Sequence, residues 1–178
     1  AAVLDTVRAT GVPVHVLPCG SDGIVPADAP IPSGTRLVAV MQVNNEIGTV
    51  QPVEALACGA HEAGALLLCD AVQGAGKMAP PIGADLIALS AHKLYGPKGI
   101  GALWIRDGLT LKPLIHGGGQ EQGLRSGTLS PALCAGFGAA AALAARSREE
   151  DAAHVETLWQ RSREILSGWT LNGSDTLR

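Results

Sequence analysis

The chain has 178 residues, of which 47% are hydrophobic and 16% are charged, and its formal net charge is -3. This composition predicts a soluble globular domain with its own apolar core, and it excludes a disordered chain or a coiled coil. No apolar run reaches the ~20 residues that a membrane-spanning helix needs, and no block of Lys and Arg offers a surface for nucleic acid. We therefore expect a small-molecule ligand, with no nucleic acid and no membrane as partners.

The cysteines show neither the C-x-x-C spacing of metal and redox sites nor the density of a disulfide-rich domain. They are Cys19, Cys58, Cys69 and Cys134. We expect idle or buried thiols in a reducing cytoplasm, with no catalytic role for any of them and no metal site.

Both ends of the chain have patterns that begin or stop within an element. Residues 1–10 predict an amphipathic helix with Val3, Leu4 and Val7 on one face, and without an N-cap. Residues 169–172 predict a strand that is just beginning. These patterns lead us to expect a partial chain.

The middle of the chain alternates between apolar runs and one helical pattern. Residues 37–43, 65–69 and 86–89 are apolar runs typical of strands buried on both faces of a parallel sheet. A helix is predicted between Pro52, in its first turn, and Gly64. A fourth strand at 99–105 follows a turn and is expected to make the sheet mixed. The prediction is an α/β domain whose ligands gather at the carboxyl ends of the strands.

Two helices are expected after the glycine-rich loop at 116–119. Ser130 and Pro131 have the positions of an N-cap and a first helical residue. The buried side of this first helix is expected to hold Leu133, Phe137 and Ala140. The second helix, 146–166, has an apolar stripe that indicates a packing face. The stripe consists of Val155, Leu158, Trp159, Ile165 and Leu166.

Lys93 follows the apolar run 86–89 within Ser90-Ala91-His92-Lys93. Desolvation at a strand end disfavours an ammonium group, so this amine is suited to form a Schiff base with an aldehyde. The alternative is a surface lysine on a turn, and that interpretation is kept for Lys77, Lys98 and Lys112.

Other polar residues follow the neighbouring strands. Asp70 ends a buried run, where a carboxylate needs a cationic partner such as a protonated pyridine nitrogen; the alternative is a helix cap. Asn45 and Gln73 can bind the phenolic oxygen of the same ring, while Ser90 and His92 can bind a phosphate. Together these residues indicate pyridoxal 5'-phosphate.

Four motifs, in this order along the chain, resemble the cysteine desulfurases, within class V of the fold-type I pyridoxal-phosphate enzymes. The motifs are Asn44-Asn45-Glu46-Ile47-Gly48, Asp70-Ala71-Val72-Gln73, Ser90-Ala91-His92-Lys93 with Tyr95-Gly96-Pro97-Lys98-Gly99, and Arg125-Ser126-Gly127-Thr128. The resemblance implies the large domain of that fold over residues 1–145, and a helix and strand leading to a small domain over 146–178. It implies that Lys93 carries the cofactor, that Asp70 pairs with its pyridine nitrogen, and that Thr128 reaches the phosphate of a neighbouring subunit in a homodimer.

The implied reaction converts L-cysteine to L-alanine and passes persulfide sulfur to an acceptor protein, for iron-sulfur cluster assembly or thiolation. By the same resemblance, the stacking histidine would precede Ala1, and the nucleophilic cysteine would follow Arg178. Gln120 and Gln122 depart from the family pattern, since many relatives have a basic residue in that loop. The alternatives are another class V enzyme, such as a selenocysteine lyase or an aminotransferase, and a non-catalytic fragment that only binds cofactor or dimerises.

Overall fold

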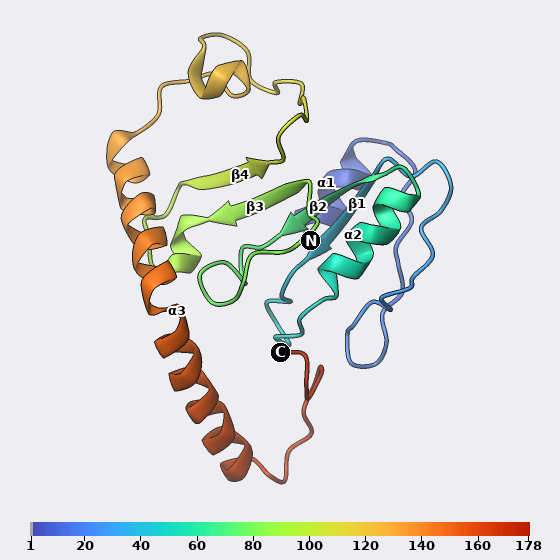
Figure 1. The fold of residues 1–178 in the computed structure, drawn as a ribbon, viewed down its shortest axis with the longest axis vertical. Coiled ribbons are helices and arrows are strands. Elements are labelled where there is room, and N and C mark those ends of the chain that lie inside the picture. The colour runs from blue at the N-terminus through green and yellow to red at the C-terminus, as the bar shows by residue number, and fades with distance from the viewer. Residues whose placement is uncertain (1) are drawn as a thin grey trace.

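The computed structural model describes residues 2–178 and is built around a sheet with the strand order β1-β2-β3-β4 (Figure 1). The strands are β1 (Leu37–Met41), β2 (Leu66–Asp70), β3 (Leu86–Ser90) and β4 (Gly101–Ile105). β2 is parallel to both β1 and β3, whereas β4 is antiparallel to β3. The expected α/β fold with a mixed sheet is therefore confirmed.

The hydrophobic core lies between the sheet and helix α2 (Val53–Glu62). Leu56 and Ala60 of α2 are buried, as are Leu67 and Cys69 of β2. Full burial of a leucine stabilises a fold by roughly 1.5–3 kcal/mol, so this layer fixes α2 on the sheet. Pro52 is the N-cap of α2 and not part of its first turn, a shift of one residue from the prediction.

The N-terminal part of the chain is helix α1 (Ala2–Ala9) followed by a long irregular segment that leads to β1. Val3, Leu4 and Val7 are half-buried, in agreement with the expected apolar face. Val12 and Val16 of the irregular segment remain more than half exposed.

Helix α3 (Pro131–Ile165) is one continuous helix of 35 residues, so the expected division into two helices is wrong. The alanine-rich run at 139–145 continues directly into Arg- and Glu-rich sequence without a breaker, and all these residue types favour helix. Ser130 caps α3 as predicted, because its Oγ accepts a hydrogen bond of 3.5 Å from the Leu133 N–H. The assignment of 1–145 and 146–178 to different parts of the protein remains a prediction.

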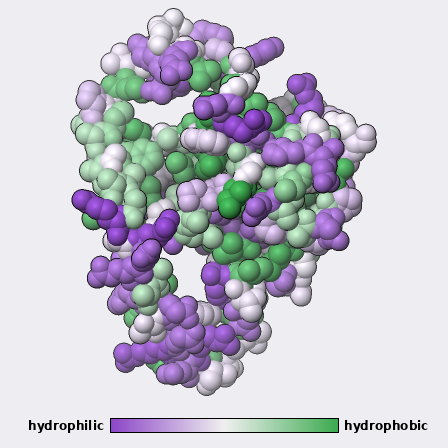
Figure 2. Space-filling model, viewed as in Figure 1, coloured by the Kyte–Doolittle hydropathy of each residue, from purple (hydrophilic) through white to green (hydrophobic). Residues whose placement is uncertain are grey.

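The two halves of α3 have different surroundings. The first half lies against the short helix η1 (Ala91–Leu94), but Leu133 and Phe137 are only half-buried there. The second half extends beyond the sheet and shows mainly hydrophilic residues (Figures 1 and 2). Val155 and Ile165 are more than 60% exposed, whereas Trp159 is half-buried and lies under the Arg178 guanidinium, 4.5 Å from its ring centre. The expected packing face is therefore covered only in part, by the C-terminal segment.

The C-terminal segment returns to the sheet without forming the strand expected at 169–172. A lone extended segment gains no ladder hydrogen bonds, and Trp169 is 79% exposed. The segment instead docks on the loop that follows β1. The Val50 N–H donates to the Leu177 carbonyl over 2.8 Å, and Arg178 Nη2 donates to the Ile47 carbonyl over 2.8 Å.

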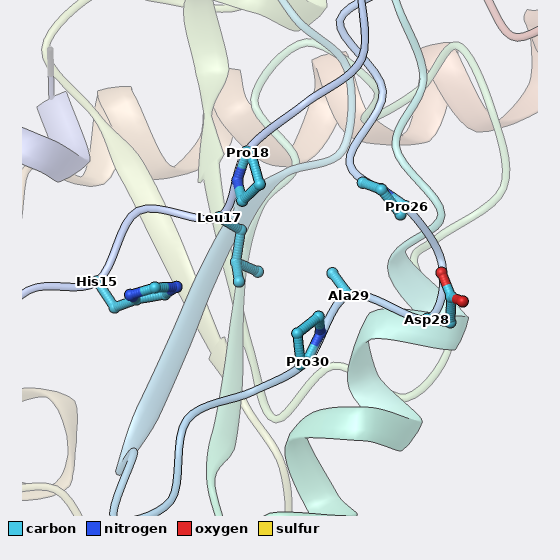
Figure 3. A pocket seen from close by; sticks show the side chains of 7 residues that line it. All are labelled: His15, Leu17, Pro18, Pro26, Asp28, Ala29 and Pro30. Atoms are coloured by element: carbon cyan, nitrogen blue, oxygen red, sulfur yellow. The ribbon is translucent and has the colours of Figure 1, made fainter.

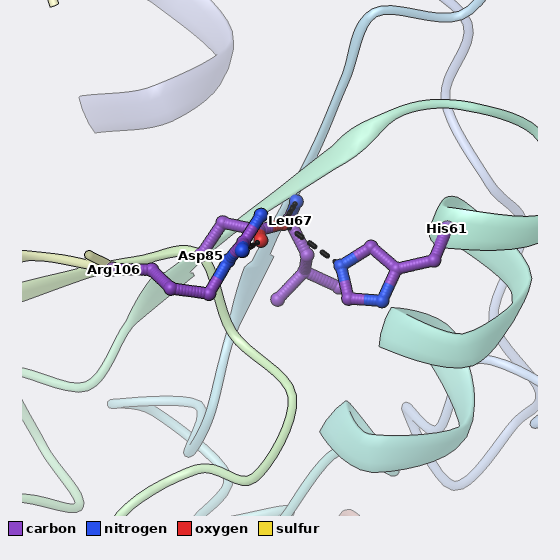
Figure 4. A network of polar contacts seen from close by, with 4 residues as sticks. All are labelled: His61, Leu67, Asp85 and Arg106. Atoms are coloured by element: carbon purple, nitrogen blue, oxygen red, sulfur yellow. Dashed lines mark hydrogen bonds and ion pairs between the residues drawn. The ribbon is translucent and has the colours of Figure 1, made fainter. Parts of the chain in front are cut away.

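Asp85, just before β3, binds the edge of the sheet at which β2 and β3 begin (Figure 4). Its fully buried carboxylate accepts hydrogen bonds from the Leu67 N–H (2.7 Å) and Arg106 Nε (2.7 Å), and it lies 2.9 Å from His61 Nε2. Burial acts to raise the pKa of Asp85, but these hydrogen bonds outweigh it, and the pKa lies below its ordinary value of 3.8. The cluster joins α2, β2 and β4.

Among the described helices, none combines the length and apolar character needed to cross a bilayer.

Candidate active site

The register of the sheet brings the predicted strand-end residues to one edge. β2 ends at Asp70 and β3 ends at Ser90, and the two strands run in the same direction. Met41, the last residue of β1, pairs with Asp70. Lys93 follows within η1. Asp70, Ser90 and Lys93 therefore occupy the carboxyl edge of adjacent parallel strands, where open α/β sheets bind their ligands.

Asp70 is half-buried and begins a tight turn. Its Oδ1 accepts a hydrogen bond of 3.0 Å from the Val72 N–H. Asp70 therefore caps a local turn and not a helix, and this bond fixes the direction of the carboxylate. Gln73 lies in the same turn and is half-buried.

Ser90 and His92 form a pair, since Ser90 Oγ lies 2.8 Å from His92 Nδ1. Between them Ala91 is buried, while Lys93 is half-buried. η1 ends at Tyr95, which adopts a left-handed conformation with φ of 62°. This tight turn places Ser90, His92 and Lys93 within four residues of one another at the end of β3.

Small residues let α3 approach the turns next to Lys93. A Cβ at Gly96 would lie 3.1 Å from the Ala140 Cβ, and one at Gly76 would lie 2.8 Å from the Ala144 Cβ. Gly76 also has φ of +73°, which strongly favours glycine. The turns after β2 and β3 are thus both packed against the same face of α3.

Asn45 is exposed on the loop after β1. Its neighbour Asn44 shapes this loop, because Asn44 Oδ1 accepts hydrogen bonds from the N–H groups of Glu46 (2.8 Å) and Ile47 (3.0 Å). Within the described residues, no hydrogen bond joins Asn45 to Asp70 or Gln73. Asn45 therefore follows the end of β1, next to the edge that carries Asp70, and its role toward a cofactor stays a prediction.

Thr128 is exposed on the segment that connects β4 to α3 (Figure 1). No hydrogen bond joins it to Ser90 or Lys93 in the part of the chain that the structure describes. Gln120, a departure from the family pattern, closes this segment by accepting a hydrogen bond of 3.1 Å from the Gly127 N–H. Gln120 therefore has a structural contact there.

The cysteines differ in their surroundings, and all four are free thiols. Cys69 is fully buried beside Asp70, and burial together with the Asp70 charge raises its pKa to about 12. It therefore stays protonated at neutral pH and is not a nucleophile. Cys134, on α3, is exposed, as are Cys19 and Cys58.

Lys77 is the site residue that sequence reasoning missed. Its Nζ lies 3.1 Å from the Gln73 carbonyl oxygen and 3.4 Å from the Lys93 carbonyl oxygen. Desolvation, followed by the nearby charge of Lys93, lowers the pKa of Lys77. The one available signal was its position four residues after Gln73, in a turn that returns toward η1.

Two surface hollows lie away from these strand ends. One of about 480 Å³ is lined by the irregular N-terminal segment, including His15, Leu17 and Asp28 (Figure 3). Another of about 200 Å³ lies between Trp159 and Trp169. The convergence of strand-end polar side chains defines the candidate site better than these apolar hollows do.

Among the described residues, no three His, Cys, Asp or Glu side chains are grouped as metal ligands.

The comparisons with known proteins agree with this arrangement. The mitosomal cysteine desulfurase of Encephalitozoon cuniculi is 42% identical over 97% of this chain and 44% of its own length. The mitochondrial cysteine desulfurase of Arthroderma benhamiae is 42% identical over 96% of this chain and 37% of its own length. A solved NifS-like protein has a TM-score of 0.86 and 36% identity, over 94% of this chain and 48% of that one. The resemblance to cysteine desulfurases is confirmed.

The comparisons also correct one expectation. A cytoplasmic location was predicted from the cysteines, but two of the most similar relatives are mitosomal and mitochondrial proteins, and the prediction is wrong. The cysteine pattern indicates a reducing environment, which is not unique to the cytoplasm.

This chain spans less than half the length of these relatives. The family model for class-V aminotransferases matches residues 1–171, and the chain therefore belongs to the class-V aminotransferase family.

Proposed function

We propose that this chain forms the cofactor-binding part of a pyridoxal-phosphate-dependent cysteine desulfurase. The observation that carries the proposal is the placement of Asp70, Ser90 and Lys93 at one edge of two adjacent parallel strands. The identity to cysteine desulfurases at 42% supports the substrate, L-cysteine.

The donor set fits pyridoxal phosphate. A half-buried carboxylate suits a protonated ring nitrogen, the Gln73 amide suits a phenolic oxygen, and a hydroxyl beside an imidazole suits a phosphate. Asp70 Oδ1 is occupied by its turn, and Oδ2 makes no hydrogen bond to a described residue. That second oxygen is the natural partner for a cationic ring nitrogen.

The remaining contacts follow from the strand ends. Asn45, exposed after β1, would add a second amide at the phenolic oxygen. Ser90 Oγ and His92 would hold the phosphate, and Thr128 would reach the phosphate site of a second copy in a homodimer. This role for Thr128 accounts for its exposure and for its lack of contact with Ser90 in its own chain.

When bound, pyridoxal phosphate supplies an electron sink for chemistry at the α-carbon of an amino acid. Lys93 is the residue that we propose to carry the cofactor and to accept and return the α-proton at its Nζ. Lys93 is half-buried at the edge of the sheet. The Asp70 carboxylate would hold the ring nitrogen of the cofactor.

The sulfur-accepting thiol of the complete enzyme is not Cys69, because that thiol is buried and protonated. We propose that an accessible cysteine on a mobile segment receives the sulfur and delivers it to an acceptor protein.

The test is to incubate the purified full-length protein with pyridoxal phosphate and L-cysteine and to measure alanine and sulfide. Lys93→Ala should abolish alanine formation, while the exposed-lysine control Lys112→Ala should retain it. L-Selenocysteine as a parallel substrate separates desulfurase from lyase preference. Undiminished alanine formation by Lys93→Ala would contradict the proposal.

A further inference from the structure

Lys77 connects the two turns that carry the proposed cofactor-binding residues. Its ammonium group contacts the carbonyl oxygen of Gln73, after β2, at 3.1 Å, and that of Lys93, after β3, at 3.4 Å. The first turn presents Asp70 and Gln73, and the second presents Ser90, His92 and Lys93. The Lys77 side chain therefore links the backbones of the two turns.

The backbone around Lys77 fixes the direction of this side chain. The Lys77 N–H donates to the Gly74 carbonyl over 3.0 Å. Next to it, Gly76 has φ of +73°, and a Cβ there would lie 2.5 Å from Leu94 Cδ2. The turn is thus pressed against the end of η1, which brings the Lys77 stem toward the Lys93 carbonyl.

The surroundings of Lys77 also affect its own pKa. Although the residue as a whole is exposed, desolvation and the charge of Lys93 both disfavour its ammonium form. The loss of water around the ammonium group agrees with its position between the two carbonyl oxygens.

We propose that Lys77 is a positioning residue for Lys93: it holds the Lys93 backbone against the Gln73 turn. The proposal rests on the proposed function of Lys93. It adds to that function a residue that touches neither cofactor nor substrate and acts through Lys93.

The test compares Lys77→Met, which keeps an aliphatic stem but loses charge and donors, with Lys77→Arg, which keeps both. Lys112→Met is the matched control, because Lys112 is exposed and makes no described contact with either turn. Two readouts use cofactor-free full-length protein. One is amide hydrogen exchange over 73–78 and 91–95, and the other is the rate of Lys93 acetylation by acetic anhydride at one fixed pH, mapped by mass spectrometry.

In Lys77→Met we expect amide exchange over 91–95 to rise about threefold or more, the loss of roughly one hydrogen bond. We also expect the rate of Lys93 acetylation to rise about twofold or more, because the backbone that carries Lys93 is less restrained. Lys77→Arg and Lys112→Met should match the wild type in both readouts.

Unchanged exchange and an unchanged rate of Lys93 acetylation in Lys77→Met would overturn the proposal. An equal change in Lys77→Arg and Lys77→Met would overturn it too, because it would show a general packing effect. Neither readout involves the cofactor, so failure here is distinct from failure of the proposed function, which would appear as loss of the cofactor adduct at Lys93.

Discussion

Replacing Asp85 with alanine should cost far more stability than a surface charge normally does. The Leu67 N–H would lose its acceptor in a buried position, which costs about 1–3 kcal/mol. The side chains of Arg106 and His61 are 51% and 44% exposed, so water can replace their bond to Asp85. Each would add only about 0.5–1 kcal/mol. We expect a total loss of about 2–5 kcal/mol in the free energy of unfolding.

Equilibrium unfolding in urea at neutral pH measures this loss, with Asp107→Ala as the control, because Asp107 is exposed two residues after β4. The control should change stability by less than about 0.5 kcal/mol. An Asp85→Ala variant that unfolds within that margin of the wild type would refute the role of the cluster in Figure 4.

The effect of Asp85 should also depend on pH. Its pKa is lower in the folded protein than the ordinary 3.8, so the ionised carboxylate stabilises the fold. This stabilisation is complete above 3.8 and is lost as the pH falls through the lower folded value. The stability difference between wild type and Asp85→Asn should therefore shrink in acid below 3.8. A difference that stays constant down to the lowest measurable pH would contradict this linkage.

Three further predictions concern the candidate site. Asp70→Asn should reduce alanine production at least about tenfold while changing the urea midpoint little, because an amide cannot balance a pyridinium charge; unchanged turnover would make Asp70 structural. A thiol reagent applied to the native protein should modify Cys58 and spare Cys69 until denaturant is added; rapid native labelling of Cys69 would contradict its burial. Gly76→Ala should destabilise the fold by about 1–3 kcal/mol, since the new Cβ meets Leu94 and Ala144 at a positive φ; an unchanged melting temperature would show that the turn relaxes.

The sequence pattern was sufficient to predict the sheet and the edge that carries the site. Apolar runs that end in Asp70 and Ser90 specify parallel strands and the side on which their ends meet, because both signals are local. The antiparallel fourth strand, which makes the sheet mixed, was also predictable from the turn that precedes Gly101.

Features that depend on tertiary contacts were not predictable. The break between two helices was expected near Arg146, yet no local signal there stops a helix, and α3 continues. Asp85 is followed directly by an apolar strand, and its partners His61 and Arg106 are distant in sequence, so its cluster left no local pattern. Lys77 resembled a surface lysine because its two acceptors are backbone carbonyls, which every residue has.

The central claim is that Lys93 is the lysine that binds the cofactor. The most direct measurement is to incubate the protein with pyridoxal phosphate, reduce it with borohydride and map the modified peptide by mass spectrometry. We expect the adduct on Lys93, the half-buried lysine that follows β3. A stoichiometric adduct on Lys77, Lys98 or Lys112, with Lys93 unmodified, would contradict it.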